Sequence, residues 1–291
     1  MTLGYGTGAL AIDRLGPEDL VELFAFLDRD PVLNVYLIAL ALRDALARPR
    51  DEVWAARRGG ALVALVYLGG HSGAILPHGE DDEAIERLAA HALTRRDALP
   101  PRAQVIGTRA AVTTFTRRFA VAGVTPRLTR SQVYLALERG QLAAIERLPQ
   151  LRRAEPTDYA LVYDSGARLR LEELDEDPRI SDPGSYSRRV EEECRDGYTH
   201  LWLEPDGLRF RASVSAITGD AAQIAGVYTP PAQRRRGYAR RGLGELCARL
   251  LERRATVCLF VNDFNLGALE LYRTLGFRHH ADWGSAFFDR L

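Results

Sequence analysis

Residues 224–251 read IAGVYTPPAQRRRGYARRGLGELCARLL, and five arginines fall between positions 234 and 241. The segment before them is apolar and β-branched, and Pro230-Pro231 cannot continue a central strand ladder. The apolar residues after the loop follow the spacing of one buried helical face; they are Leu243, Leu246, Cys247, Leu250 and Leu251. The stretch therefore predicts a strand, a basic loop and an amphipathic helix, with Gly237 at the helix start.

The start of this predicted helix has the chemistry of an anion site. The first turn of a helix leaves backbone N–H groups unpaired, and the helix dipole adds partial positive charge there. Gly237 would let a phosphate approach the backbone, and flanking arginines offer forked donors. We interpret the loop as a pyrophosphate site, although a solvated basic surface or a nucleic-acid patch would share its composition. It is neither a P-loop, which needs lysine, nor a three-glycine dinucleotide fingerprint.

The composition favours a folded protein with a balanced charge. The chain has 291 residues, of which 46% are hydrophobic and 27% charged, which suits one large domain or two ordinary ones. Its 39 basic and 39 acidic residues give a formal net charge of zero, which argues against a globally basic nucleic-acid binder. All the basic residues are arginine, and we attribute this to the codon bias of a GC-rich genome.

The cysteine pattern and the first residues of the chain favour a cytoplasmic location of the protein. Cys194, Cys247 and Cys258 have no paired spacing and an odd count, so we expect reduced thiols and neither a disulfide frame nor a zinc site. The first residues lack the pattern of a signal peptide. The longest apolar run, 31–42, is too short to span a bilayer and predicts a buried helix. We therefore expect a cytoplasmic protein without membrane contact.

The order of predicted elements repeats along the chain. Each half predicts helices, antiparallel strands, a helix, a strand, a helix and a final strand. In the first half, residues 52–69 predict a hairpin that turns at Gly59-Gly60. We place a domain boundary near Pro149, which gives domains 1–148 and 149–291, and we interpret them as two diverged copies of one fold.

A second motif, VCLFVNDFNLGALELYRTLGF, occupies residues 257–277. It predicts an apolar strand, then Asn265, then a short helix that carries Tyr272 and ends at Gly276. Taken alone, Tyr272 fits half-buried packing next to Leu269 and Leu275 better than it fits a functional role.

Together the two motifs resemble the GNAT superfamily of acyl-CoA-dependent N-acetyltransferases. VYTPP followed by RRRGYA, and then N-x-x-A-x-x-L-Y-x-x-x-G-F, carry the resemblance, which is close over roughly 200–280. It implies an α/β (α+β) fold of two GNAT-like domains, each a mixed, mostly antiparallel twisted sheet flanked by helices. The arrangement looks like actinobacterial-type tandem proteins whose N-terminal domain is degenerate and whose C-terminal domain is catalytic.

The resemblance also implies site residues. The backbone of Val227, Tyr228 and Thr229 would pair with the pantetheine arm of acetyl-CoA, and Asn265 would contact the cofactor. Tyr272 would act as the general acid on the leaving thiolate. The pyrophosphate would be held by the loop and the helix start, that is by Arg234, Arg235, Arg236, Gly237, Tyr238, Ala239 and Arg240.

The remaining catalytic parts are predicted from the chemistry. Acyl transfer needs a polarised carbonyl, which a backbone N–H at a bulge in the strand 221–229 could provide. It also needs a base for the amine; Glu204 is the first candidate, followed by His200 and the run Glu191-Glu192-Glu193. We expect no metal, since His279-His280 are adjacent in a predicted strand and point to opposite faces.

The first domain departs from the family pattern. Its strand–helix junction, AILPHGEDDEAIERLA, is acidic, and an acidic helix start would repel a pyrophosphate. Phenylalanine stands in FTRRFAVAG where the second domain has Tyr272. We expect the first domain not to bind acetyl-CoA.

Three functions are compatible with these observations. The favoured one is an N-acetyltransferase acting by direct attack of a primary amine, either a protein lysine or a small molecule, as a monomer or homodimer without nucleic-acid partners. The second is a non-catalytic acyl-CoA-binding regulatory module. The third is a nucleic-acid binder that uses the arginine run.

Overall fold

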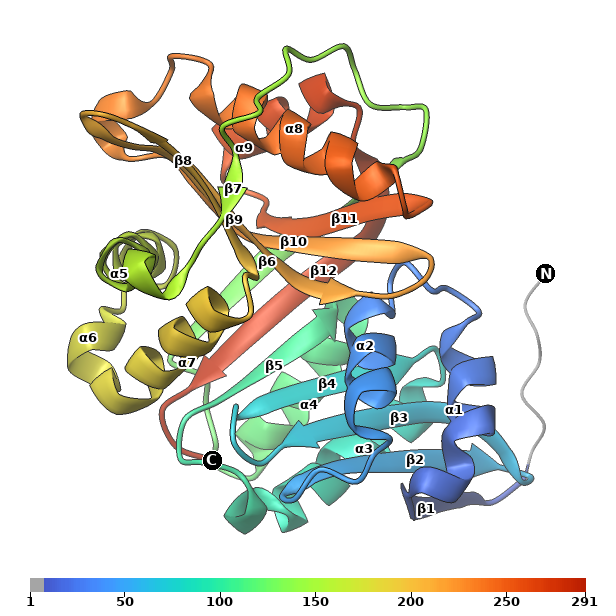
Figure 1. The fold of residues 1–291 in the computed structure, drawn as a ribbon. Helices are drawn as coiled ribbons and strands as arrows, with labels where there is room; N and C mark the ends of the chain where they lie inside the picture. Colours follow the sequence, from blue (N-terminus) through green and yellow to red (C-terminus); the bar gives the residue numbers. More distant parts are fainter. Residues whose placement is uncertain (1–7) are drawn as a thin grey trace. The chain divides into compact units, whose positions relative to one another are not determined.

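The computed structural model describes residues 8–291, and the chain packs as two compact units (Figure 1). Unit 1 contains the chain through Tyr134 together with Phe260–Phe264 and His280–Leu291; unit 2 contains Leu135–Leu259 and Asn265–His279. The prediction that no signal peptide is present concerns the chain start, of which residues 1–7 lie outside the described residues.

Unit 1 begins with a strand, two helices and a three-stranded meander. Its elements are β1 (Leu10–Leu15), α1 (Leu20–Leu27), α2 (Val35–Asp44), β2 (Asp51–Arg58), β3 (Ala61–Gly69), β4 (Ala74–Gly79), α3 (Asp82–Thr94), β5 (Ala103–Thr108) and α4 (Arg109–Val121). Strands β1 to β4 pair antiparallel in sequence order, and β4 pairs parallel with β5. The predicted hairpin is confirmed, with Gly59 and Gly60 at φ values of 58° and 87° in its turn.

Helices cover both faces of the unit 1 sheet, as alternate residues of β3 demonstrate. Val66 and Leu68 pack with α3 and α4, in a cluster that includes Phe115. Leu65 and Tyr67 pack with α1 and α2 in a second cluster. The near-continuous apolar run of β3 therefore reflects a strand buried on both sides.

Unit 2 repeats the same order of elements. These are β7 (Arg152–Arg153), α5 (Tyr159–Leu174), α6 (Pro178–Ser181), α7 (Pro183–Arg195), β8 (Thr199–Glu204), β9 (Gly207–Ile217), β10 (Ala221–Tyr228), α8 (Tyr238–Leu251), β11 (Thr256–Asn262) and α9 (Leu266–Leu275). Strands β7 to β10 pair antiparallel in sequence order, and β10 pairs parallel with β11. The predicted fold class is confirmed, because each unit has a mixed, mostly antiparallel sheet flanked by helices.

Three strands contribute residues to both units: β6 (Leu128–Glu138), β12 (Arg278–Phe288) and β11, whose last residues from Phe260 onward belong to unit 1. Within unit 1, β12 pairs antiparallel with β5, and Ser285 lies opposite Ile106. Packing thus places residues 280–291 in unit 1, although they follow the second copy in sequence. The division of the chain at residues 148 and 149 stays a prediction.

The two faces of β9 differ in character. Phe210 faces α8, and a Cβ on Gly242 of α8 would lie only 2.5 Å from its ring, so glycine permits the close approach. Arg211 and Ser213 lie on the other face, where Val162 and Tyr186 of α5 and α7 form a buried cluster. None of the described helices is long and apolar enough to cross a membrane.

Candidate functional site

A β-bulge interrupts β10 near its C-terminal end. Ala225 lies opposite Ser213 and Tyr228 lies opposite Arg211, so β10 carries one extra residue between these pairs. Gly226 within the bulge has a φ of 62°. A Cβ there would find its nearest neighbour, the Ser213 Oγ, at 3.6 Å, so the positive φ rather than crowding requires glycine. The predicted bulge is confirmed.

The other edge of β10 has a short parallel pairing. Ala221, Ala222 and Gln223 lie opposite Thr256, Val257 and Cys258 of β11, and the registered pairing ends there. In the part of the chain that the structure describes, the bulged end of β10 therefore has no registered partner on this edge. An extended ligand could pair with a backbone edge of this kind.

Tyr228 and Thr229 at this end are both buried, with 4% and 8% of their surface exposed. The Thr229 hydroxyl has no hydrogen-bond partner among the described residues, whereas its carbonyl accepts from Arg234 Nε at 3.0 Å. The role of Val227, Tyr228 and Thr229 in pairing with pantetheine remains a prediction, and one lone pair of the Thr229 carbonyl is already used within the chain.

The loop before α8 leaves a run of backbone donors unpaired. Arg235 and Gly237 have φ values of 61° and 81°, and Gly237 is the N-cap residue without any side-chain cap. The first helical bond joins Arg241 N to Gly237 O at 3.0 Å. Among residues 8–291, the N–H groups of residues 235–240 have no acceptor. Successive N–H groups beside left-handed residues form anion-binding concavities.

The arginines of the loop divide into engaged and free groups. Arg234 donates to Glu172 Oε2 at 2.6 Å in addition to Thr229, and Arg240 donates to the Ala144 carbonyl at 3.3 Å. The exposed side chains of Arg235 and Arg236 have no polar partner within the described residues. These two guanidinium groups are consequently the ones available to an external anion.

Arg241 lies outside the predicted pyrophosphate span, and its side chain is engaged within unit 2. Its guanidinium pairs with Glu146 at 2.9 Å, donates to the Arg147 carbonyl at 3.1 Å and lies 5.3 Å from the Trp202 ring centroid. Arg241 thus attaches the first turn of α8 to its surroundings in unit 2.

Glu204 and His200, two candidate bases, both belong to β8. Glu204 accepts the indole N–H of Trp202 at 2.8 Å, and the Trp202 ring meets the Tyr238 ring edge-on at 5.1 Å. Burial, and secondarily the charge of Arg153, lowers the pKa of His200 to about 4. A group with so low a pKa is a weak base near neutral pH. The role of Glu204 as general base stays a prediction, and its carboxylate already accepts a hydrogen bond from Trp202.

Helix α9 carries the two predicted residues of the second motif. Asn265 is its N-cap, and its Oδ1 accepts from Ala268 N at 3.2 Å. Tyr272 is 6% exposed and packs against Phe277 with ring centroids 5.8 Å apart. Its hydroxyl has no hydrogen bond within the described part of the chain. Burial, followed by the charge of Glu173, raises the pKa of Tyr272, so the phenol keeps its proton at neutral pH.

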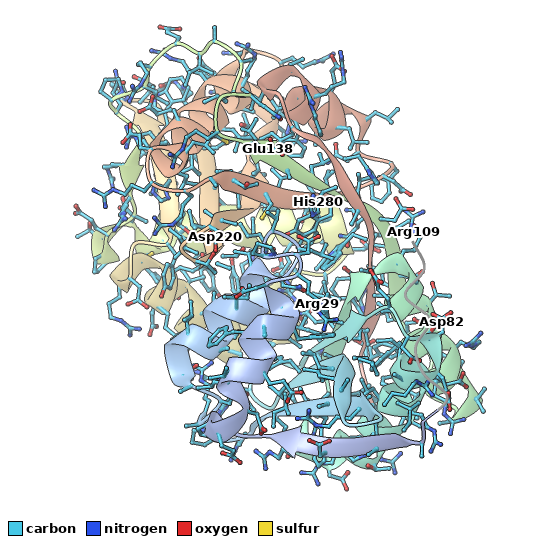
Figure 2. All side chains as sticks on the ribbon, turned by 90° about the vertical axis from the view of Figure 1, so that its right-hand side faces the viewer. Arg29, Asp82, Arg109, Glu138, Asp220 and His280 are labelled. Atoms are coloured by element: carbon cyan, nitrogen blue, oxygen red, sulfur yellow. The ribbon has the colours of Figure 1, made fainter. Side chains whose placement is uncertain are left out.

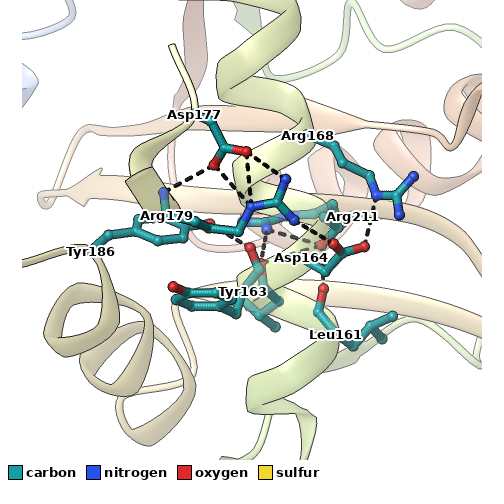
Figure 3. A network of polar contacts seen from close by, with 10 residues as sticks. Leu161, Tyr163, Asp164, Arg168, Asp177, Arg179, Tyr186 and Arg211 are labelled. Atoms are coloured by element: carbon teal, nitrogen blue, oxygen red, sulfur yellow. Dashed lines mark hydrogen bonds and ion pairs between the residues drawn. The ribbon is translucent and has the colours of Figure 1, made fainter. Parts of the chain in front are cut away.

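A buried arginine that sequence reasoning missed lies beneath the bulge. Arg211 is 4% exposed, and its NH1 donates to the Val162 carbonyl at 2.9 Å. Figure 3 shows it among polar groups of α5 and α7, where Tyr186 donates to the Tyr163 carbonyl at 2.6 Å. Burial lowers the pKa of Arg211. An arginine in a strand usually predicts an exposed position, so only the alternation of RFRASVS hinted at an inward polar row.

The corresponding helix start in unit 1 binds its own carboxylate. Asp81 caps α3 by accepting from Ala84 N at 3.0 Å, and Asp82, labelled in Figure 2, adds charge to the first turn. Arg58 pairs with Asp81 at 2.9 Å. Phe119 of α4 is 1% exposed within the core. These features fit a domain without a pyrophosphate site, but degeneracy of the first domain stays a prediction.

The described residues contain no group of three or more histidine, cysteine or acidic side chains that could hold a metal ion. His280 (Figure 2) contacts Asp30 at 2.9 Å in unit 1. The three cysteines are buried and form no disulfide among the described residues.

The chain is similar to a known family in sequence over one segment, and to solved structures in fold over nearly its full length. Residues 150–277 match the model of the acetyltransferase (GNAT) family. No curated protein shows significant sequence similarity. A Drosophila protein matches with a TM-score of 0.66 and 14% identity, covering 96% of this chain and 99% of that chain.

Two further solved structures are similar in fold. A GCN5-related N-acetyltransferase from Sphaerobacter thermophilus has a TM-score of 0.59 and 17% identity, over 97% of this chain and 96% of its own. A tandem GNAT protein from the clavulanic acid biosynthesis pathway has a TM-score of 0.57 and 17% identity, over 96% and 98%. At these identities the likeness concerns the fold alone.

Proposed function

Because residues 150–277 match the model of the GNAT acetyltransferase family, we propose that the protein transfers the acetyl group of acetyl-CoA to a primary amine. The observation that carries the proposal is the run of unpaired N–H groups at residues 235–240, beside the free guanidinium groups of Arg235 and Arg236. Six successive donors and two cations suit a pyrophosphate, since charge-assisted hydrogen bonds are the strongest available.

Each part of the site has a distinct task in this reaction. The backbone of Val227, Tyr228 and Thr229 binds the extended pantetheine arm, and the bulge at Gly226 directs a backbone N–H toward the thioester carbonyl. Tyr272 donates its proton to the departing thiolate, which its buried, protonated phenol suits. Asn265 holds the start of α9 and offers its amide N–H groups to the same ligand.

A second function is a regulatory module that binds acyl-CoA without turnover. The observation that favours it is the absence of a strong base at the first candidates: Glu204 is bound to Trp202, and His200 has a depressed pKa. The module and the enzyme predict the same cofactor affinity and differ only in product formation.

The test combines calorimetric binding of acetyl-CoA with release of free CoA in the presence of an amine panel. The panel contains a lysine peptide with blocked ends, an aliphatic diamine and an amino sugar. Enzyme function predicts binding together with CoA release that depends on one of the amines. Binding without release on any amine identifies the regulatory module, and no binding contradicts both functions.

Tyr272→Phe separates acid catalysis from binding. We expect turnover to fall about 10- to 100-fold, because general acid catalysis contributes factors of this size, while the acetyl-CoA affinity stays the same. Full turnover by the variant would contradict the role of Tyr272.

A further inference from the structure

A chain of hydroxyl groups leads from the bulge to a carboxylate on α7. Ser213 Oγ lies 3.6 Å from the position of a Cβ on Gly226. It is 2.7 Å from Thr199 Oγ1, which donates to Glu193 Oε2 at 3.1 Å. The three side chains come from β9, β8 and α7, so no local sequence pattern brings them together.

The hydrogen-bond direction along this chain follows from the chemistry of its ends. An ionised carboxylate only accepts, so Thr199 donates to Glu193, and Ser213 must then donate to Thr199. Arg211 NH2 donates to Ser213 Oγ at 3.4 Å and fills one of its two lone pairs. One acceptor lone pair of Ser213 remains, at the end of the chain next to Gly226.

Resting on the function proposed above, we infer that Ser213 and Thr199 relay the proton of the bound ammonium substrate to Glu193. The amine proton passes to Ser213 Oγ, the Ser213 proton passes to Thr199, and the Thr199 proton passes to Glu193. The neutral amine then forms the C–N bond as the thioester C–S bond breaks, and the thiolate takes the proton of Tyr272. The nitrogen of the new amide loses its surplus proton, which returns the Tyr272 phenolate to its protonated state. The proton held by Glu193 returns to solvent after turnover.

Charged and titratable neighbours surround Glu193 without blocking this role. Arg211 NH2 lies 3.5 Å from Oε2, and Arg189 Nε lies 3.9 Å from Oε1. Tyr186 and Cys194 are the other titratable groups that the buried side of α7 presents here. The Glu193 side chain is 23% exposed, which gives its proton a path to solvent.

The relay predicts a specific pH dependence. With the amine of highest turnover from the panel, Glu193→Gln should lower kcat/KM about 100-fold at pH 7, which is the usual size of base catalysis. The deficit should shrink as the pH approaches the pKa of an alkylamine, about 10.4, because the substrate then arrives neutral. Acetyl-CoA binding by calorimetry should not change. The matched control is Glu252→Gln, an exposed carboxylate at the end of α8, which should behave as wild type.

The hydroxyl groups give an independent test with a built-in rescue. Thr199→Val keeps the shape of this fully buried residue and breaks the relay, whereas Thr199→Ser keeps the hydroxyl. We expect Thr199→Val and Ser213→Ala to resemble Glu193→Gln, and Thr199→Ser to retain most activity. Thermal melting of each variant shows whether a loss of activity is due to unfolding of the protein.

The outcomes distinguish the relay from the activity on which it rests. If the wild type acetylates an amine and both Glu193→Gln and Ser213→Ala keep kcat/KM within twofold of the wild type, the relay is wrong but the proposed function stands. A deficit that is the same at pH 7 and pH 10 also overturns it, because a structural role would not depend on the substrate's protonation. A wild-type protein that acetylates no amine overturns the proposed function and the relay together.

Discussion

Substituting Gly237 by alanine tests whether the loop before α8 is the pyrophosphate site. Gly237 has a φ of 81°, and a Cβ there would meet no protein atom within 4 Å. The cost of the substitution in the folded protein is therefore backbone strain alone, about 1–2 kcal/mol for an L-residue in the left-handed region. Lower entropy of the unfolded chain returns about 0.4–1 kcal/mol. We expect the free energy of unfolding to fall by roughly 1 kcal/mol, measured by urea denaturation.

Ligand binding should suffer more than stability. The added methyl group occupies open space next to the unpaired N–H groups of residues 235–240, where a phosphate would approach the backbone. We expect the Kd for acetyl-CoA, measured by calorimetry well below the melting temperature, to rise at least 10-fold, or about 1.4 kcal/mol. Gly267→Ala is the matched control: it is also open and exposed, but it lies in α9 and its φ is not positive.

A specific result would refute this reasoning. If Gly237→Ala loses about 1 kcal/mol of stability but binds acetyl-CoA like the wild type, the loop is a strained helix start and the pyrophosphate lies elsewhere. If Gly267→Ala weakens binding equally, the effect is not specific to the loop.

Three further predictions concern other parts of unit 2. Arg235→Ala should weaken acetyl-CoA binding several-fold and reduce its salt dependence, whereas Arg240→Ala, whose side chain is bound to Ala144, should change calorimetric affinity less. Gly276→Ala should destabilise by several kcal/mol in urea denaturation, because it combines a φ of 104° with a Cβ only 2.2 Å from the Gln141 carbonyl oxygen. Glu245 is 1% exposed; despite its burial, hydrogen bonds from Arg147 and then Arg249 lower its pKa from 4.5 to about 2. A lowered folded-state pKa stabilises above the unfolded value, so this contribution should disappear as the pH falls from about 4.5 to 2. Melting of Glu245→Gln should show less pH dependence than the wild type in that range, and an unchanged dependence would contradict the assignment.

The sequence by itself determined the local structure and located most residues of the proposed cofactor site. The strand before Pro230, the glycine at the start of α8, and Tyr272 on α9 are local features, because propensity, turn chemistry and helix periodicity act within about ten residues. The repeated order of elements was also readable, since each copy carries its own patterning.

Only the tertiary structure decided which polar groups are free and which are engaged. The sequence gives the five arginines of the loop equal status, but contacts with α5 and with residues 144–147 engage Arg234, Arg240 and Arg241 and leave Arg235 and Arg236. The hydroxyl chain from Ser213 to Glu193 depends on pairing between β8 and β9 and on the packing of α7. Such contacts join residues that are up to 96 positions apart, and their formation depends on the whole fold and not on any local preference.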